Sequence, residues 1–127
     1  MELAQLLLLA SLLPSTTYGY GEKNCGDIGS PRSCDSSAVT ASGIGFDPTR
    51  AMVAIAAPKK LRLKARHIGL RVPGGACHKV LLADKMNPRY IGSRGFDLTP
   101  AAVALLTGKP ASPVWSGRVE VCALSKG

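Results

Sequence analysis

The sequence lacks the residue spacings that mark several common catalytic and metal sites. It has no Cys-x-x-Cys and no His-x-x-x-His pair, and its two histidines, His67 and His78, stand apart from each other. No serine is spaced with a histidine and an aspartate as in a recognisable catalytic triad. These absences argue against a tetrahedral zinc site and against a serine hydrolase, so we expect no metal and no other cofactor.

The sequence also has no internal repeat and no apolar run long enough to span a bilayer. Its main apolar run, Leu6–Leu13, ends at Pro14, and the following residues Thr17 and Gly19 are small, as a signal peptidase requires. We therefore predict a signal peptide over residues 1–19, which implies a secreted or periplasmic protein without a stable membrane anchor. The first five residues contain no Lys or Arg, and a buried N-terminal helix is the alternative.

Acidic residues are scarce: the chain has 8 Asp and Glu against 16 Lys and Arg, a net charge of +8. Such a surface attracts polyanions such as nucleic acid, anionic lipid or an acidic cell-wall polymer. One stretch, residues 59–66, is a basic cluster, and its alternation predicts a strand with Arg62, Lys64 and Arg66 on one face. That face is either the solvated outside of a barrel strand or a dedicated polyanion site.

Four cysteines, an even number in a small exported chain, predict two disulfides. Cys25 and Cys34 are close in sequence among glycines and a proline, which makes a local loop disulfide plausible. Cys77 and Cys122 then remain for a link between strands, but three pairings are possible and the sequence leaves them open. We interpret residues 20–37 as a disulfide-tethered N-terminal arm.

The remaining residues, 38–127, have the pattern of one small, mainly β domain. The expected strands alternate apolar and polar residues and are separated by turn residues. They are Ala38–Thr40, Met52–Ala56, Leu61–Arg66, Gly69–Val72, Lys79–Ala83 and Arg118–Leu124. One helix is expected over Pro100–Leu106, with Thr99 as its N-cap and Gly108 as its stop. Short strands with a single helix predict a small closed barrel.

In their order, several short segments resemble the double-psi β-barrel of the rare lipoprotein A family, and more distantly the barrels of expansins and barwin-like proteins. The resemblance covers about residues 38–124 and implies a six-stranded double-psi β-barrel. The segments that carry it are Thr40-Ala41-Ser42-Gly43, Phe46-Asp47, Ala51-Met52, Leu61-Arg62-Leu63-Lys64, Val80-Leu81-Leu82-Ala83-Asp84, Asn87-Pro88, Ile91-Gly92, Phe96-Asp97-Leu98-Thr99-Pro100-Ala101-Ala102 and Gly117-Arg118-Val119-Glu120-Val121.

The resemblance implies contact with peptidoglycan, whose glycan strands the family's lytic members cleave without water. Those members have a Glu directly after Thr-Ala-Ser-Gly and a His later in an Ala-Ala-His run. In this chain the corresponding residues are Ile44 and about Ala56, neither of which can donate a proton. Asp84 and Asp97 remain at matching positions.

Asp97 precedes the expected helix, and three roles are open for it: ligand contact, proton donation, or a local turn stabiliser. Phe96 is expected to desolvate Asp97 and raise its pKa, while the helix start opposes this. Asp84 ends a strand, and Asp84 and Asp97 would bracket a sugar, with Tyr90 as a stacking platform and Arg94 nearby. A surface ion pair between Asp84 and Arg94 is the plain alternative.

Three functions follow. The first is an exported module that binds peptidoglycan or a related cell-wall polysaccharide, rather than nucleic acid, with weak or no lytic activity. The second is an active lytic transglycosylase that uses Asp97, with Asp84 as a further catalytic candidate. The third is a secreted protein-interaction module. The oligomeric state is not readable from the sequence.

Overall fold

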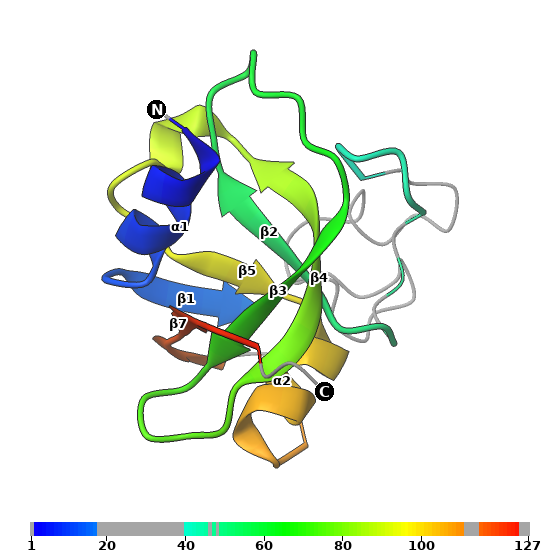
Figure 1. The fold of residues 1–127 in the computed structure, drawn as a ribbon, viewed down its shortest axis with the longest axis vertical. Coiled ribbons are helices and arrows are strands. Elements are labelled where there is room, and N and C mark those ends of the chain that lie inside the picture. Colours follow the sequence, from blue (N-terminus) through cyan, green and yellow to red (C-terminus); the bar gives the residue numbers. More distant parts are fainter. Residues whose placement is uncertain (1, 18–39, 46, 48, 111–114, 125–127) are drawn as a thin grey trace.

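Seven strands join into one mixed sheet that curls into half a barrel (Figure 1). The computed structural model describes residues 2–17, 40–45, 47, 49–110 and 115–124. Its elements are α1 (Leu3–Ala10), β1 (Pro14–Thr17), β2 (Met52–Ala56), β3 (Arg66–Arg71), β4 (His78–Met86), the 3-10 helix η2 (Pro88–Tyr90), β5 (Phe96–Leu98), α2 (Pro100–Thr107), β6 (Ser116–Arg118) and β7 (Glu120–Cys122). The mainly β class agrees with the sequence prediction, whereas six strands and one helix were expected.

The strand order is β6-β1-β5-β2-β4-β3-β7, so β2 lies at the centre of the sheet. The pairs β1–β5 and β2–β4 are parallel and the other pairs are antiparallel. A bulge shifts the register of β2 against β4 between Val53 and Ala54. The two edge strands, β6 and β7, are neighbours in sequence and are separated only by Val119, which is fully buried.

The core lies against one face of the sheet, with α1 and α2 at opposite ends of the fold (Figure 1). Strand β2 supplies Val53 and Ile55, and β5 supplies Phe96 and Leu98. The helices add Leu6 and Ala10 from α1, and Ala102, Val103 and Leu106 from α2. Adjacent strand residues point to opposite faces, so the alternate residues of β2 and β5 face away from this core.

Helix α2 follows from its local sequence as predicted. The Thr99 hydroxyl accepts a hydrogen bond from the Ala102 amide, which satisfies a donor of the first turn. Gly108 adopts a left-handed conformation with φ of 70° and ends the helix. The Thr99 hydroxyl also accepts a hydrogen bond from the Met52 amide at 3.0 Å and donates one to the Arg50 carbonyl at 2.6 Å. These bonds connect the start of α2 to the start of β2.

The N-terminal segment, predicted as a signal peptide, forms regular structure with long-range contacts. Helix α1 buries Leu6 and Ala10, and β1 inserts between β5 and β6. The Phe96 amide of β5 donates to the fully buried Ser15 hydroxyl of β1 at 2.8 Å. Cleavage at the predicted boundary after residue 19 would therefore remove an internal strand of this sheet. No helix among the described residues is long and apolar enough to cross a membrane.

The predicted strands Leu61–Arg66 and Gly69–Val72 are replaced by one strand, β3. Residues 61–65 still alternate in exposure, since Leu63 is buried while Arg62 and Lys64 are exposed. Residues 61–65 are not paired with any strand, however. Their backbone is held instead by the Lys85 ammonium, which donates to three carbonyls, those of Pro58, Lys59 and Leu61. The alternation of apolar and basic residues thus correctly predicted which side chains of residues 61–65 are buried, but it wrongly predicted that these residues form a strand.

The predicted link between Cys77 and Cys122 is present, whereas Cys25 and Cys34 lie outside the described residues. It joins the start of the β4 region to β7 across a sequence separation of 45. Gly69 makes room for it, because a Cβ at that position would lie 2.7 Å from the Cys77 sulfur. The link thus fastens the β7 edge of the sheet.

Replacing both Cys77 and Cys122 by serine should lower the free energy of unfolding by about 4 kcal/mol, because a loop of this length is released in the unfolded chain. Urea unfolding of the purified variant, compared with the parent, measures this loss. A change below about 1 kcal/mol would mean that β7 is held mainly by its pairing with β3.

Candidate functional site

Asp97 and Asp84, which the sequence singled out, lie in one row across three neighbouring strands. Ala54 of β2 is the register partner of Asp97 in β5 and of Asp84 in β4. Register partners point to the same face of a sheet, so both carboxylates flank the Ala54 methyl group on the face opposite the Phe96 side chain. Two strand spacings place their Cα atoms about 10 Å apart. The small Ala54 side chain is the only one between them in this row.

The row continues through β1, where Thr16 is the register partner of Asp97. The Thr16 hydroxyl donates to Asp97 Oδ1 at 2.8 Å. This bond fixes the orientation of the half-buried carboxylate at an interior position of the sheet, not in a turn. Phe96, which was expected to desolvate Asp97, packs in the core, and the next residue along a strand points to the other face.

Asp84 has a different environment at the other end of the row. Its Oδ1 accepts the backbone amides of Ala41 and Lys85, each at 2.9 Å. Burial raises the pKa of Asp84, and this desolvation outweighs the opposing hydrogen bonds and the charge of Lys85. Its Oδ2 accepts no hydrogen bond from any described residue. The alternative, an ion pair between Asp84 and Arg94, is not formed between these two described residues, whereas Arg71 and Glu120 do form an ion pair.

The motif Thr40-Ala41-Ser42-Gly43 forms the turn that supports Asp84. The Thr40 amide and hydroxyl both donate to the Ile44 carbonyl, and Gly43 takes a φ of 90° that suits glycine. The Ser42 amide donates to the Ala83 carbonyl at 3.0 Å, which docks the turn on β4. The motif therefore positions the Ala41 amide on the Asp84 carboxylate.

The positions where the resembled family has its Glu and His are apolar and packed in this chain. Ile44 packs against a second small cluster of Met52, Leu81 and Ala83 on the face away from the main core. Ala56 is buried at the end of β2. Neither residue offers a proton donor or acceptor on its side chain.

Tyr90 and Arg94 lie in the connection between β4 and β5 and contact each other. The Arg94 guanidinium carbon is 4.6 Å from the centre of the Tyr90 ring, and that of Arg89 is 5.1 Å from it. Both arginines are within cation–π distance, so they compete with a sugar for the ring face. No described contact joins Tyr90 or Arg94 to Asp84 or Asp97. The structure thus brings together the two acids but not the whole predicted set.

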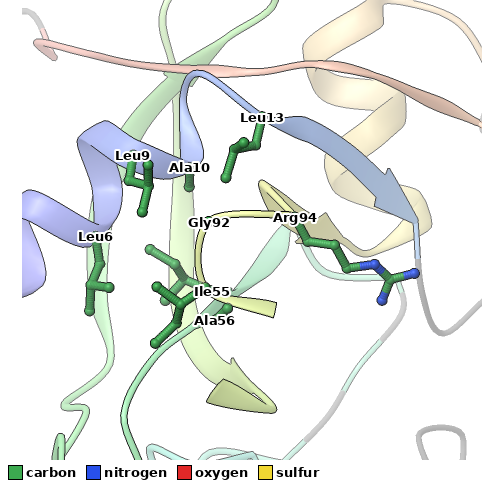
Figure 2. A pocket seen from close by; sticks show the side chains of 9 residues that line it. Leu6, Leu9, Ala10, Leu13, Ile55, Ala56, Gly92 and Arg94 are labelled. Carbon is green, nitrogen blue, oxygen red and sulfur yellow. The ribbon is translucent and has the colours of Figure 1, made fainter. Parts of the chain in front are cut away.

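Arg94 instead borders a small apolar cavity between α1 and the sheet (Figure 2). Leu6, Leu9 and Ala10 of the helix face Ile55 across it, while the Arg94 guanidinium points away from these side chains (Figure 2). The cavity has a volume of about 10 Å³, enough for about one water molecule. Close packing of α1 therefore leaves no space for a sugar here.

Asp47 and Trp115 have structural roles. Asp47 accepts the Thr49 hydroxyl and amide in an exposed turn, and the hydroxyl bond is the main reason that its pKa is lowered. Trp115 packs against the main core. No group of three His, Cys, Asp or Glu side chains among the described residues is placed to hold a metal ion.

Sequence reasoning missed Thr16 and Ala54, which complete the row. Thr16 fell within the predicted signal peptide, and an alanine has no chemistry that marks it as a site residue. Only strand register reveals either of them. Comparison with protein-family models and with curated proteins gave no match.

Proposed function

We propose that this chain is an exported double-psi β-barrel protein, resembling the rare lipoprotein A family, that binds peptidoglycan or a related cell-wall glycan with weak or no lytic activity. The row Thr16–Asp97–Ala54–Asp84 carries the proposal. Two half-buried carboxylates on either side of a methyl group are suited to accept hydrogen bonds from sugar hydroxyls.

The barrel part of the proposal is supported by the two edge strands. The segment 116–122 pairs with β1 through β6 and with β3 through β7. Counted as one bent strand, it links both edges of the half-barrel into a ring with β1, β5, β2, β4 and β3, which makes six strands. Closure of this kind removes exposed sheet edges.

Weak or absent catalysis is supported by the apolar packing of Ile44 and Ala56. A lytic transglycosylase that uses Asp97, with Asp84 as a further catalytic residue, is the second candidate, and one observation on Asp84 favours it. Asp84 and Asp97 have different surroundings, and Asp84 has a raised pKa. A raised pKa makes the Asp84 carboxyl a better proton donor to a glycosidic oxygen, so Asp84 would act beside Asp97 in such an enzyme.

The two candidates are separated by one assay on purified peptidoglycan. The full chain is incubated with the insoluble polymer, and both the bound protein and the released soluble sugars are measured. We expect sedimentation with the polymer and no release above background. Asp97→Asn should weaken binding about tenfold or more, because it replaces a charged acceptor of hydrogen bonds.

Asp47→Asn is the matched control, since Asp47 lies in an exposed turn, where its carboxylate accepts hydrogen bonds from Thr49 and is not a member of the row. It should bind as the parent does. Release of anhydro-sugar fragments that disappears in Asp97→Asn would establish the enzyme instead. If the parent does not sediment even at low salt, glycan binding is refuted and a protein partner becomes the better hypothesis.

A further inference from the structure

The net positive charge of this chain is concentrated in one stretch of sequence. Residues 48–83 contain eight Lys and Arg and no Asp or Glu. The rest of the chain contains the other eight Lys and Arg and all eight Asp and Glu, so its formal charge is zero. Residues 48–83 alone therefore account for the net charge of +8. The charge is therefore a local feature of the β2–β4 region and not a general property of the surface.

Within that stretch, the connection between β2 and β3 carries the densest part, here called the basic segment (residues 59–66). Its five basic side chains are all exposed: Lys59, Lys60, Arg62, Lys64 and Arg66. The apolar residues between them turn inward, and Leu63 is buried in the main core. This connection projects beyond the sheet at the top of Figure 1.

Residues 61–65 have no strand partner, yet the backbone of the basic segment is held near both ends, by Lys85 and by the pairing of Arg66 with Leu82. The Lys85 ammonium donates to the Leu61 carbonyl at 2.7 Å and to the Lys59 carbonyl at 3.1 Å. These bonds hold a turn in which the Leu61 amide donates to the Pro58 carbonyl at 3.0 Å. From Arg62 to Arg66 exposed and inward-facing residues alternate as in an extended chain, in which Arg62, Lys64 and Arg66 would recur at about 7 Å. Such a row matches a linear polymer with regularly repeated anionic groups better than it matches a single small anion.

No described carboxylate neutralises the basic segment, because the ion pair among the described residues is formed by Arg71 and Glu120. Five like charges within eight residues repel one another, and an anionic ligand relieves that repulsion. Residues 48–83 contain no Phe, Tyr or Trp on which a nucleic-acid base could stack. The large exposed apolar residues of the described chain, Leu8, Leu12, Leu105 and Leu124, lie outside the stretch, so nothing there favours insertion into lipid.

From this we infer that the basic segment is a binding surface for a linear acidic polysaccharide, recognised through its repeated carboxylate, sulfate or phosphate groups. The basic segment shares no residue with the Asp84–Asp97 row, and the inference does not depend on the function proposed for that row. Its role would be to hold the protein on an acidic polymer, whatever the row contacts.

The test measures binding of the full chain to heparin and polygalacturonate, with dextran as the neutral polymer and oligo-dT as an anion that carries bases. The double variant Arg62→Ser/Lys64→Ser removes two charges from the basic segment. Its matched control, Lys109→Ser/Lys126→Ser, removes two charges outside residues 48–83. Circular dichroism confirms that each variant is folded.

We expect the parent to bind both acidic polysaccharides but not dextran, and to bind more weakly as salt rises. The logarithm of the association constant decreases linearly with the logarithm of the salt concentration. In the segment variant the size of this slope should be about 1–2 smaller, because each lost contact no longer releases counterions on binding. The control should keep the parental slope. Equal losses in the two double variants would show a diffuse charge effect and overturn the inference, as would tighter binding to oligo-dT than to either polysaccharide.

Discussion

A chain that lacks residues 1–19 will not form this sheet, whereas a chain that lacks only residues 1–10 will. The longer deletion removes β1, so β5 and β6 lose a shared partner and their backbone groups lose those hydrogen bonds. It also removes the Ser15 hydroxyl that accepts the Phe96 amide, and the Thr16 hydroxyl bound to Asp97. We expect no cooperative unfolding transition for this variant.

The shorter deletion removes only α1. Burial of Leu6 alone contributes about 2 kcal/mol, so the variant should be less stable than the full chain but still folded. Ser11 is retained, and its hydroxyl still accepts the Val121 amide at 3.0 Å. Urea unfolding followed by circular dichroism compares the two variants with the full chain.

A cooperative β-type transition in the chain that lacks residues 1–19 would contradict this account and would support cleavage at the predicted boundary. If the prediction holds, an exported form of the protein must be processed on the N-terminal side of Pro14. The mass of the secreted protein provides an independent measurement of that site.

The sequence predicted those parts of the fold that depend on neighbours in the chain. Helix α2 has its cap and its stop within ten residues, and β2 is an uninterrupted apolar run. Strand β1 was missed because its partners, β5 and β6, come about 80 and 100 residues later in the chain. An apolar run followed by small polar residues is equally consistent with a signal peptide, and local pattern cannot distinguish the two.

The candidate site shows the same limit. Asp84 and Asp97 were identifiable as polar residues beside apolar strands, but their placement in one row depends on the register of β4 and β5 against β2. The bulge at Val53 and Ala54 contributes to that register. Tyr90 was chosen because it is aromatic, and the sequence could not reveal that two arginines contact its ring.

Asp84→Asn should make the protein more stable at neutral pH and impair glycan binding. Asparagine keeps a carbonyl oxygen that can accept the Ala41 and Lys85 amides, but it removes the charge that burial disfavours. Binding should fall about tenfold or more, because a charged acceptor becomes a neutral one. Sedimentation with peptidoglycan and urea unfolding of the same preparation measure both effects.

The pH dependence provides a sharper measurement of the same group. The pKa of Asp84 in the folded protein is raised above its ordinary value of 3.8, so the folded state binds this proton more tightly than the unfolded chain does. Its contribution to stability is therefore greatest below pH 3.8 and is lost as the pH rises through the raised pKa. As the pH rises from 3.8 through the raised pKa, the unfolding free energy of Asp84→Asn should increase relative to that of the parent. Above the raised pKa the difference should stay constant. Taking the difference cancels the titration of the other carboxylates.

Asp84→Ala separates the charge from the hydrogen bonds. It leaves the Ala41 and Lys85 amides without their acceptor, so it should be less stable than Asp84→Asn by about 1–3 kcal/mol at every pH. Should Asp84→Asn prove as destabilising as Asp84→Ala, with no change across the acidic range, then Asp84 serves only to hold the Thr40–Gly43 turn. A stable asparagine variant that no longer binds glycan means instead that the chain keeps a costly buried charge because its ligand requires one.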